Sequence, residues 1–337
     1  MSSVPTQDPQ DVPGPESDPA LNQPPDTMAL VSVRAQAESG VVQRGSVELT
    51  LMRLRRDKAA LVSAVFIVFL ILFAVFAPLT EVITGHGVNE QLRATGLTAA
   101  GVPTGPGAEF WFGADQLGRD VFVRLAYGAR ISLLVGVAAS LLAALIGITV
   151  GITAGYFGGR VDTVLSRVMD LVMSVPFLLS AIALVSVFGP SLALSVIVIV
   201  FFSWTPMARV IRGQTLALRE REFVEAARSL GARHFSIMLR DILPNLTVPI
   251  IIYVTLMIPN SIVFEATLSF LGMGIVPPTP SWGRMLSEAA GNSVYLVAWW
   301  LVVFPGMALL FTTMAFNVLG DGLRDALDPR ARRRAPK

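Results

Sequence analysis

Six long apolar segments dominate this chain and decide what it can fold into. Their bounds are Ala59–Leu79, Ile131–Tyr156, Leu171–Phe188, Leu192–Met207, Thr247–Thr267 and Val294–Phe316. A membrane-spanning helix needs roughly 20 mostly apolar residues, and helices satisfy their own backbone hydrogen bonds in lipid. Only 15% of the 337 residues are charged, whereas soluble proteins have about 25%. The sequence therefore predicts an all-α integral membrane protein with six spanning helices, the fourth of them short.

The distribution of Lys and Arg predicts how the chain is oriented. With both termini on one side, nineteen of the Lys and Arg residues from Arg53 onward fall on that side and five on the other. Basic residues are enriched on the cytoplasmic side of membrane proteins. We therefore expect both termini to be cytoplasmic.

The chain divides into four regions by composition. Residues 1–50 are rich in proline and lack apolar periodicity, which is typical of a disordered cytoplasmic tail. Residues 51–126 hold the first spanning helix and an outer loop, and 127–325 hold a core of five further helices. Residues 326–337 form a basic cytoplasmic tail. No cleavable signal peptide precedes the first span, because a basic stretch followed by an apolar one is missing from the N-terminal region.

Several kinds of chemistry are excluded by residue counts. The chain has no cysteine and two histidines that lie far apart in sequence, so we expect no metal site and no catalytic residues. Its two lysines, Lys58 and Lys337, are not in a Gly-rich loop, so a P-loop for ATP is absent. One further pattern, Gly147, Gly151 and Gly155 at four-residue spacing, is typical of closely packed membrane helices.

A charged stretch, FVEAARSLGARHFSIMLRDILP, lies between the fourth and fifth apolar segments at Phe223–Pro244. Its residues predict a short helix, a break at Gly231 and a second helix. Its pattern, with Glu225-Ala226-Ala227, Gly231 and Leu243-Pro244, resembles the EAA loop of permease subunits from ABC importers. Under the predicted topology this loop faces the cytoplasm.

Five further blocks resemble one branch of these permeases. The branch is the dipeptide/oligopeptide/nickel family, and the likeness is closest to its second, C-type, subunit. It runs from about Leu51 to Arg330, and its blocks are Leu51–Val68, Phe112–Gly136, Gly151–Asp170, Glu265–Leu286 and Leu319–Arg330. The resemblance implies the transmembrane domain of a type I ABC importer, with six helices and a cytoplasmic coupling helix.

The resemblance also implies partners and a place for them. The chain would lie in a bacterial inner membrane beside a similar second permease and receive cargo from an extracytoplasmic binding protein. Two ATPase subunits, or one two-domain ATPase, would bind ATP and Mg, and this chain would hold no cofactor and bind no nucleic acid. The residues implied to contact the ATPase are Phe223, Glu225, Ala226, Ala227, Leu230, Gly231, Leu243 and Pro244.

Other interpretations of these residues remain open from the sequence. The charged loop could lie on lipid headgroups through its arginines. Glu265, an acid within an apolar segment, is a pathway candidate, or it pairs with a neighbouring helix or caps the outer loop. Four apolar residues of the outer loops are candidates for docking the binding protein, or they form an interfacial aromatic belt. They are Phe110, Trp111, Trp282 and Met285.

The expected function is import of peptides, with the chain forming half of the pathway. The resembled branch also handles nickel chelates, haem and glutathione, which leaves the cargo open. A secondary transporter is a weaker alternative, because paired membrane acids and an internal repeat are not evident in the sequence. An intramembrane enzyme lacks a cluster of catalytic residues in the apolar segments.

Overall fold

The computed structural model describes residue 54 and residues 57–327, apart from the side chain of Asn292. The predicted proline-rich tail (1–50) and most of the predicted basic tail (326–337) lie outside these residues. In the described part, secondary structure is helical, with only two isolated β-bridges, Leu97 with Pro103 and Ala114 with Asp120.

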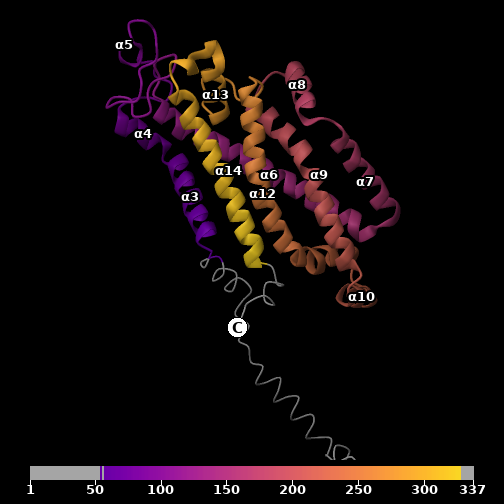
Figure 1. The fold of residues 1–337 in the computed structure, drawn as a ribbon. Coiled ribbons are helices and arrows are strands. Elements are labelled where there is room, and N and C mark those ends of the chain that lie inside the picture. Colours follow the sequence, from indigo (N-terminus) through magenta and orange to yellow (C-terminus); the bar gives the residue numbers. More distant parts are fainter. Residues whose placement is uncertain (1–53, 55–56, 328–337) are drawn as a thin grey trace, which may run out of the picture. The chain divides into compact units, whose positions relative to one another are not determined.

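Five long helices form a bundle (Figure 1). They are α3 (Lys58–Val75), α6 (Val121–Phe157), α9 (Leu192–Arg219), α12 (Thr247–Phe270) and α14 (Trp300–Leu327). At one end of the bundle lie α4 (Ala77–Thr84), α5 (Arg93–Gly96) and α13 (Trp282–Ala290); we call this the α13 end. The opposite end carries α10 (Glu222–Ser229) and is called the α10 end.

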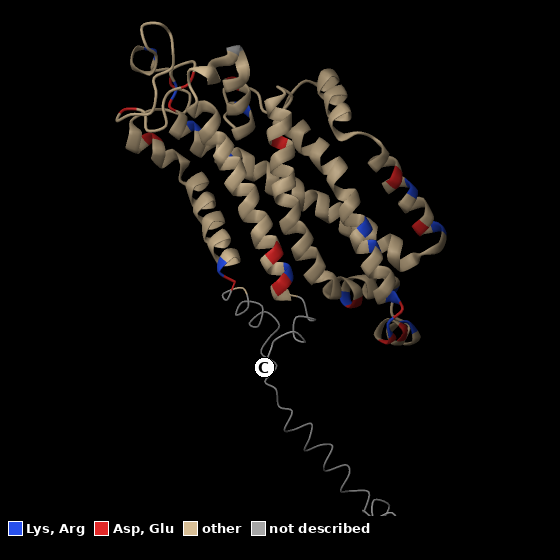
Figure 2. Cartoon of the chain, viewed as in Figure 1, with Lys and Arg blue, Asp and Glu red and all other residues tan. Residues whose placement is uncertain are grey.

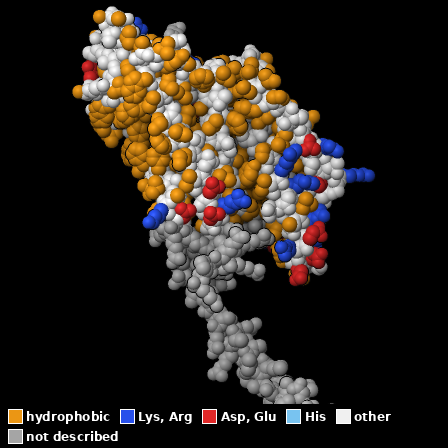
Figure 3. Space-filling model, in the orientation of Figure 1, with side chains coloured by type: hydrophobic (Ala, Val, Ile, Leu, Met, Phe, Trp, Pro, Cys, Tyr) orange, Lys and Arg blue, Asp and Glu red, His pale blue; other side chains and the backbone are white. Residues whose placement is uncertain are grey.

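The surface between the two ends is suited to lipid. Charged residues gather at the ends and along α7 (Gly159–Ser174), and the middle of the bundle is nearly free of them (Figure 2). Apolar side chains cover the visible face in between (Figure 3). By length and composition, five helices could each cross a membrane, or six if a bent pair counts as one span. This agrees with the predicted all-α membrane protein.

The bent pair corrects the third predicted span. Instead of one helix over 171–188, the structure has α7 ending at Ser174 and α8 running over Phe177–Phe188, with a bend of 79° between them. Val175, between the helices, is extended (ψ 125°), as the residue before a proline prefers to be. Pro176 has no backbone N–H to continue the helix.

Three other spans are longer than predicted, and in two of them charged side chains lie on the added turns or cap them. Helix α6 begins at Val121 rather than Ile131, where the Asp120 carboxylate accepts hydrogen bonds from the Phe122 and Val123 backbone N–H groups. Helix α9 extends to Arg219 rather than Met207, and its Arg209 and Arg212 pair with Asp170 and Asp162 of α7. Helix α12 begins at the predicted Thr247 and runs three residues past Thr267.

The first and last spans are shifted by local breaks. The first predicted span, Ala59–Leu79, is divided at Phe76, where Pro78 in the first turn of α4 lacks the N–H that would continue α3. The last begins at Trp300 rather than Val294, because residues 291–296 form the 3₁₀ helix η4 (Gly291–Leu296). It then runs to Leu327, where the last turns pack closely, with Gly320 facing Leu256 of α12.

Helices α6 and α9 make the closest contact in the bundle, and the three spaced glycines lie in it. A Cβ added at Gly147 would lie 2.8 Å from Met207 Cβ, and one at Gly151 would lie 2.7 Å from the Ala208 carbonyl oxygen. A Cβ at Gly155 would lie 2.6 Å from Thr215 Cβ. The glycine spacing therefore serves helix packing, as the sequence predicts.

Candidate functional site

Helix α10 is short and is stabilised by the charges in its first and last turns and by the hydrogen bonds at its C-terminal end. Glu222 and Glu225 lie in its first turn and Arg228 in its last, which complements the helix dipole. Gly231 follows with φ 79°, a conformation that glycine adopts without strain. The N–H of Gly231 donates to the Arg228 carbonyl (2.9 Å) and that of Ala232 to the Ala227 carbonyl (3.0 Å), which closes the helix end.

One side of α10 packs against the bundle and the other is exposed. Val224 is fully buried in a cluster with Ile237, Ile242 and Leu246, and the half-buried Ala227 packs against the same cluster. Phe223, Glu225, Ala226 and Leu230 are all exposed. Phe223 is 42% exposed and Leu230 88% exposed. We call these four residues the α10 outer face.

The chain returns from α10 to the bundle through a run of unusual helical turns. The single turn α11 (His234–Ser236) leads into a π-helix, η2 (Ile237–Ile242), and then a 3₁₀ helix, η3 (Leu243–Leu246), which ends at α12. Leu243 is half-buried against the cluster that holds Val224, and Pro244 is exposed in the first turn of η3. The segment that holds α10 is thereby continuous with α12.

A polar contact that sequence reasoning missed joins the α10 segment to α6. The Tyr156 hydroxyl lies 2.9 Å from His234 Nδ1, and the Arg228 guanidinium lies over the Tyr156 ring, 5.1 Å from its centroid. Arg219 Nη1 also donates to the Gly155 carbonyl oxygen at 3.4 Å. Because Tyr156 and His234 are 78 residues apart, only the fold brings them together.

Glu265 is completely buried near the α13 end of α12, within a cluster of serines. Its Oε2 accepts a hydrogen bond from Ser132 Oγ of α6 (3.1 Å) and its Oε1 accepts one from Ser269 Oγ (2.7 Å). Ser132 Oγ in turn accepts from the Trp282 backbone N–H (3.3 Å). This geometry favours the interpretation in which Glu265 joins neighbouring helices and the outer loop.

Three of the four docking candidates require correction. Phe110, Trp282 and Met285 are buried, so their side chains are not available to a docked protein. Trp282 Nε1 donates to the Leu125 carbonyl oxygen (3.2 Å), and Phe110 stacks on His86. The outer loop is folded against the bundle, which a linear sequence does not reveal. Trp111 is 47% exposed and remains a candidate.

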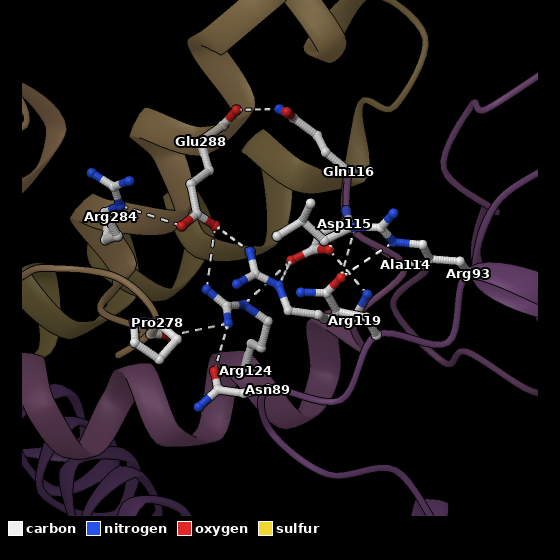
Figure 4. Close-up of polar contacts among 12 residues, drawn as sticks. Asn89, Arg93, Ala114, Asp115, Gln116, Arg119, Arg124, Pro278, Arg284 and Glu288 are labelled. Carbon is white, nitrogen blue, oxygen red and sulfur yellow. Dashed lines mark hydrogen bonds and ion pairs between the residues drawn. The ribbon is translucent and has the colours of Figure 1, made fainter.

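A buried cluster of charges at the α13 end was not singled out from the sequence (Figure 4). Glu288 Oε2, on α13, accepts hydrogen bonds from Arg119 Nη2 (2.9 Å) and Arg124 Nη2 (3.2 Å). Asp115 Oδ2 accepts a hydrogen bond from Arg119 Nε (2.6 Å). Arg284 Nε lies 3.3 Å from Glu288 Oε1. Arg124 is only 1% exposed, so this cluster fastens the loop before α6 to α13.

The sequence matches known families over most of its length. The family described as "Binding-protein-dependent transport system inner membrane component" matches residues 147–333. The family described as "N-terminal TM domain of oligopeptide transport permease C" matches residues 48–85. The chain belongs to the family of binding-protein-dependent transport system inner membrane components.

Relatives and one solved structure are similar to this permease. The dipeptide transport system permease protein DppC of Bacillus subtilis (strain 168) is 40% identical over 315 residues, which cover 93% of this chain and 95% of the relative. The glutathione transport system permease protein GsiD of Shigella flexneri serotype 5b (strain 8401) is 45% identical over 278 residues, which cover 82% of this chain and 88% of the relative. A chain from inward-facing MetNI, a methionine ABC transporter, is 15% identical with a TM-score of 0.45, covering 58% of this chain and 94% of its own.

The family match and the two permease relatives confirm the expected family and general function. The chain is a multi-pass membrane permease subunit of an ABC importer and resembles the C-type subunit of the peptide branch. Membership implies ATPase subunits, a second permease and a binding protein as partners. The alternative of an ATP-independent secondary transporter is not supported by this assignment. The matched range 147–333 includes the α10 outer face, whereas Asp115, Arg119 and Arg124 lie between the two matched ranges.

Proposed function

We propose that this permease forms half of an import pathway for short peptides and that the α10 outer face is its contact with an ATPase subunit. The proposed contact with the ATPase rests mainly on the two sides of α10, which is buried at Val224 and has an exposed apolar side at Phe223 and Leu230. Glu225 and the small Ala226 lie exposed between these two apolar residues. A short helix with this surface fits a cleft on a folded partner.

The connection of α10 to the bundle provides a path for motion. The Val224 cluster includes Ile152 of α6, Ile211 of α9 and Met257 of α12. A displacement of α10 would therefore act on three long helices at once. ATP and Mg bind in the separate ATPase subunits, whose closure moves α10 as a rigid element and changes the access of the pathway. The permease itself supplies no catalytic residue.

The same proposal orients the molecule with both termini and the α10 end in the cytoplasm. Its support is the bias of Lys and Arg toward that side. The chain has no native cysteine, so single cysteines report on orientation cleanly. An impermeant thiol reagent should label Leu296→Cys in intact cells and Leu230→Cys only after permeabilisation. The reverse pattern would reject this orientation.

The cargo proposal rests on the relatives. DppC is a dipeptide permease and GsiD a glutathione permease, and glutathione is itself a tripeptide. Short peptides are the class that includes both. The alternatives of nickel chelate and haem have no support among these relatives.

Replacing Glu225 by lysine tests the coupling contact. Glu225 is exposed on α10, so Glu225→Lys should leave membrane insertion intact while abolishing peptide uptake and peptide-stimulated ATP hydrolysis. Glu109→Lys, an exposed acid in the loop at the α13 end, is the matched control and should retain uptake. Normal uptake in Glu225→Lys would reject α10 as the coupling element. Uptake of another solute class by the wild-type complex would reject only the cargo.

A further inference from the structure

A cavity of about 390 Å³ lies at the α13 end beside the buried charge cluster. The loop before α6 and helix α13 form most of its wall (Figure 4). Its charged lining comes from Asp115, Arg119, Arg124, Arg284 and Glu288. It is separate from the α10 outer face, which lies at the opposite end of the bundle.

The carboxylate oxygens of this cluster are already engaged. Asp115 Oδ1 accepts from the backbone N–H groups of Leu117 (2.9 Å) and Arg119 (3.0 Å), and its Oδ2 accepts from Arg119 Nε. Glu288 Oε1 faces Arg284, and its Oε2 accepts from both Arg119 and Arg124. These two acids therefore have no free oxygen with which to bind another cation.

Two of the three arginines, by contrast, have unused hydrogen-bond donors. Arg124 uses all three of its nitrogens, with Nη1 donating to Asn89 Oδ1 and to the Pro278 carbonyl. Among the described residues, Arg119 Nη1 and both Nη atoms of Arg284 have no recorded hydrogen-bond partner. Three guanidinium groups against two carboxylates leave one positive charge uncompensated in the cluster. The Arg119 side chain is only 6% exposed and that of Arg284 22% exposed, and a charge with little access to water is costly unless it is paired.

The rest of the wall is apolar. Leu117, Val121, Met285 and Leu301 line the cavity together with Pro277 and Ala289. Small-molecule sites are commonly about 300–1,000 Å³, mostly apolar, and have a few convergent polar groups. Guanidinium groups are well matched to carboxylates, which they can bind through two N–H groups.

We propose that this cavity binds a small organic carboxylate, with Arg284 and Arg119 donating to its oxygens and its apolar part against Met285 and Leu301. The bound carboxylate would balance the charge of the cluster and join α13 more firmly to the loop before α6. This site does not depend on the nature of the transported cargo.

Binding of N-acetyl-leucine tests the proposal, with N-acetyl-leucine amide as its uncharged counterpart. Isothermal titration would use the full-length chain with its copurifying subunits in lipid nanodiscs. We expect saturable binding of the acid and at least about tenfold weaker binding of the amide, because charge-assisted hydrogen bonds are lost. Equal binding of acid and amide, or no saturable binding of the acid, would overturn the proposal.

Variants locate the binding to this cavity. Arg284→Gln should weaken binding of the acid by about tenfold or more, and Arg284→Lys should weaken it less, because the charge remains although the paired N–H groups are lost. Arg93→Gln is the matched control, since Arg93 is exposed, lies in the same loop region and, within the described part of the chain, its side chain hydrogen-bonds to Gln91 alone. A thermal melt of each apo variant checks folding. Equal loss in Arg93→Gln, or full binding in a folded Arg284→Gln, would contradict the assignment.

Discussion

At the scale of single residues, the buried ionisable side chains are the most constrained features of this permease. Glu265 is surrounded by serines from α6 and α12, whereas Arg124 is held by Glu288 and Asp115. Both lie where water is scarce. An uncompensated charge there is costly, so these partners decide whether the surrounding helices can pack.

Replacing Glu265 separates a structural role from a role in the pathway. Glu265→Gln keeps one acceptor oxygen for a serine hydroxyl and places an NH₂ donor toward the other serine, whose hydroxyl oxygen can accept. We therefore expect stability within about 1 kcal/mol of the wild type and unchanged uptake. Glu265→Leu leaves these hydroxyls without their acceptor and should cost about 1–3 kcal/mol. Thermal unfolding in detergent measures both. Lost uptake in a fully stable Glu265→Gln would contradict the structural role.

Glu288→Gln should destabilise the α13 end strongly. The substitution removes the carboxylate shared by Arg119 and Arg124, which are nearly buried. Breaking one partner of a buried ion pair typically costs about 3–5 kcal/mol, and because Glu288 is 21% exposed we expect the lower end of that range. The control is Glu109→Gln, an exposed acid of the same loop region. Equal melting temperatures for the two variants would show that the cluster does not stabilise the fold.

Sequence reasoning could identify one of these two buried ionisable residues and not the other. Glu265 stands out because it is an acid inside an apolar segment. Arg124 stands in a charged stretch that reads as loop, and its partner Glu288 is 164 residues away. Contacts at such separation leave no local pattern, so neither the cluster nor the burial of Trp282 follows from the sequence.

At the scale of elements, the contact between α6 and α9 is set by residue size. The glycines at 147, 151 and 155 allow the α9 backbone to approach, as their spacing predicts. Pro176 predicts a kink in the third span, but the division of this span into α7 and α8 with a bend of 79° is seen only in the structure. Prolines elsewhere, such as Pro206 in α9, remain inside a helix. A proline by itself therefore does not reveal whether a span is broken.

Gly151→Val tests the close approach of these helices. A Cβ at Gly151 would lie 2.7 Å from the Ala208 carbonyl oxygen and 2.8 Å from Ile211 Cβ, so the helices must separate. Overpacking of this kind costs about 1–3 kcal/mol or more, and we expect a lower melting temperature in detergent. Gly213→Ala in α9 is the control, because its Cβ would meet nothing within 4 Å and alanine favours helix. A wild-type melting temperature for Gly151→Val would contradict the packing.

At the scale of the whole molecule, the two ends of the bundle present different surfaces. The α10 end offers a helix with an exposed apolar side, and the α13 end is a loop and helix fastened by buried charges. The family and the position of the short helix α10 could be predicted from sequence, because they rest on ordered local motifs. Which residues of α10 face outward could not, because that depends on the packing of Val224 against distant residues such as Met257.

Cross-linking from single cysteines is the most direct test of the coupling account. Leu230 is 88% exposed at the α10 end and Leu296 is 74% exposed at the α13 end, and the chain has no native cysteine. With a short thiol-to-amine cross-linker in native membranes, Leu230→Cys should join the permease to an ATP-hydrolysing subunit, and Leu296→Cys should not. ATPase adducts from Leu296→Cys, with none from Leu230→Cys, would contradict the assignment of α10 as the coupling helix.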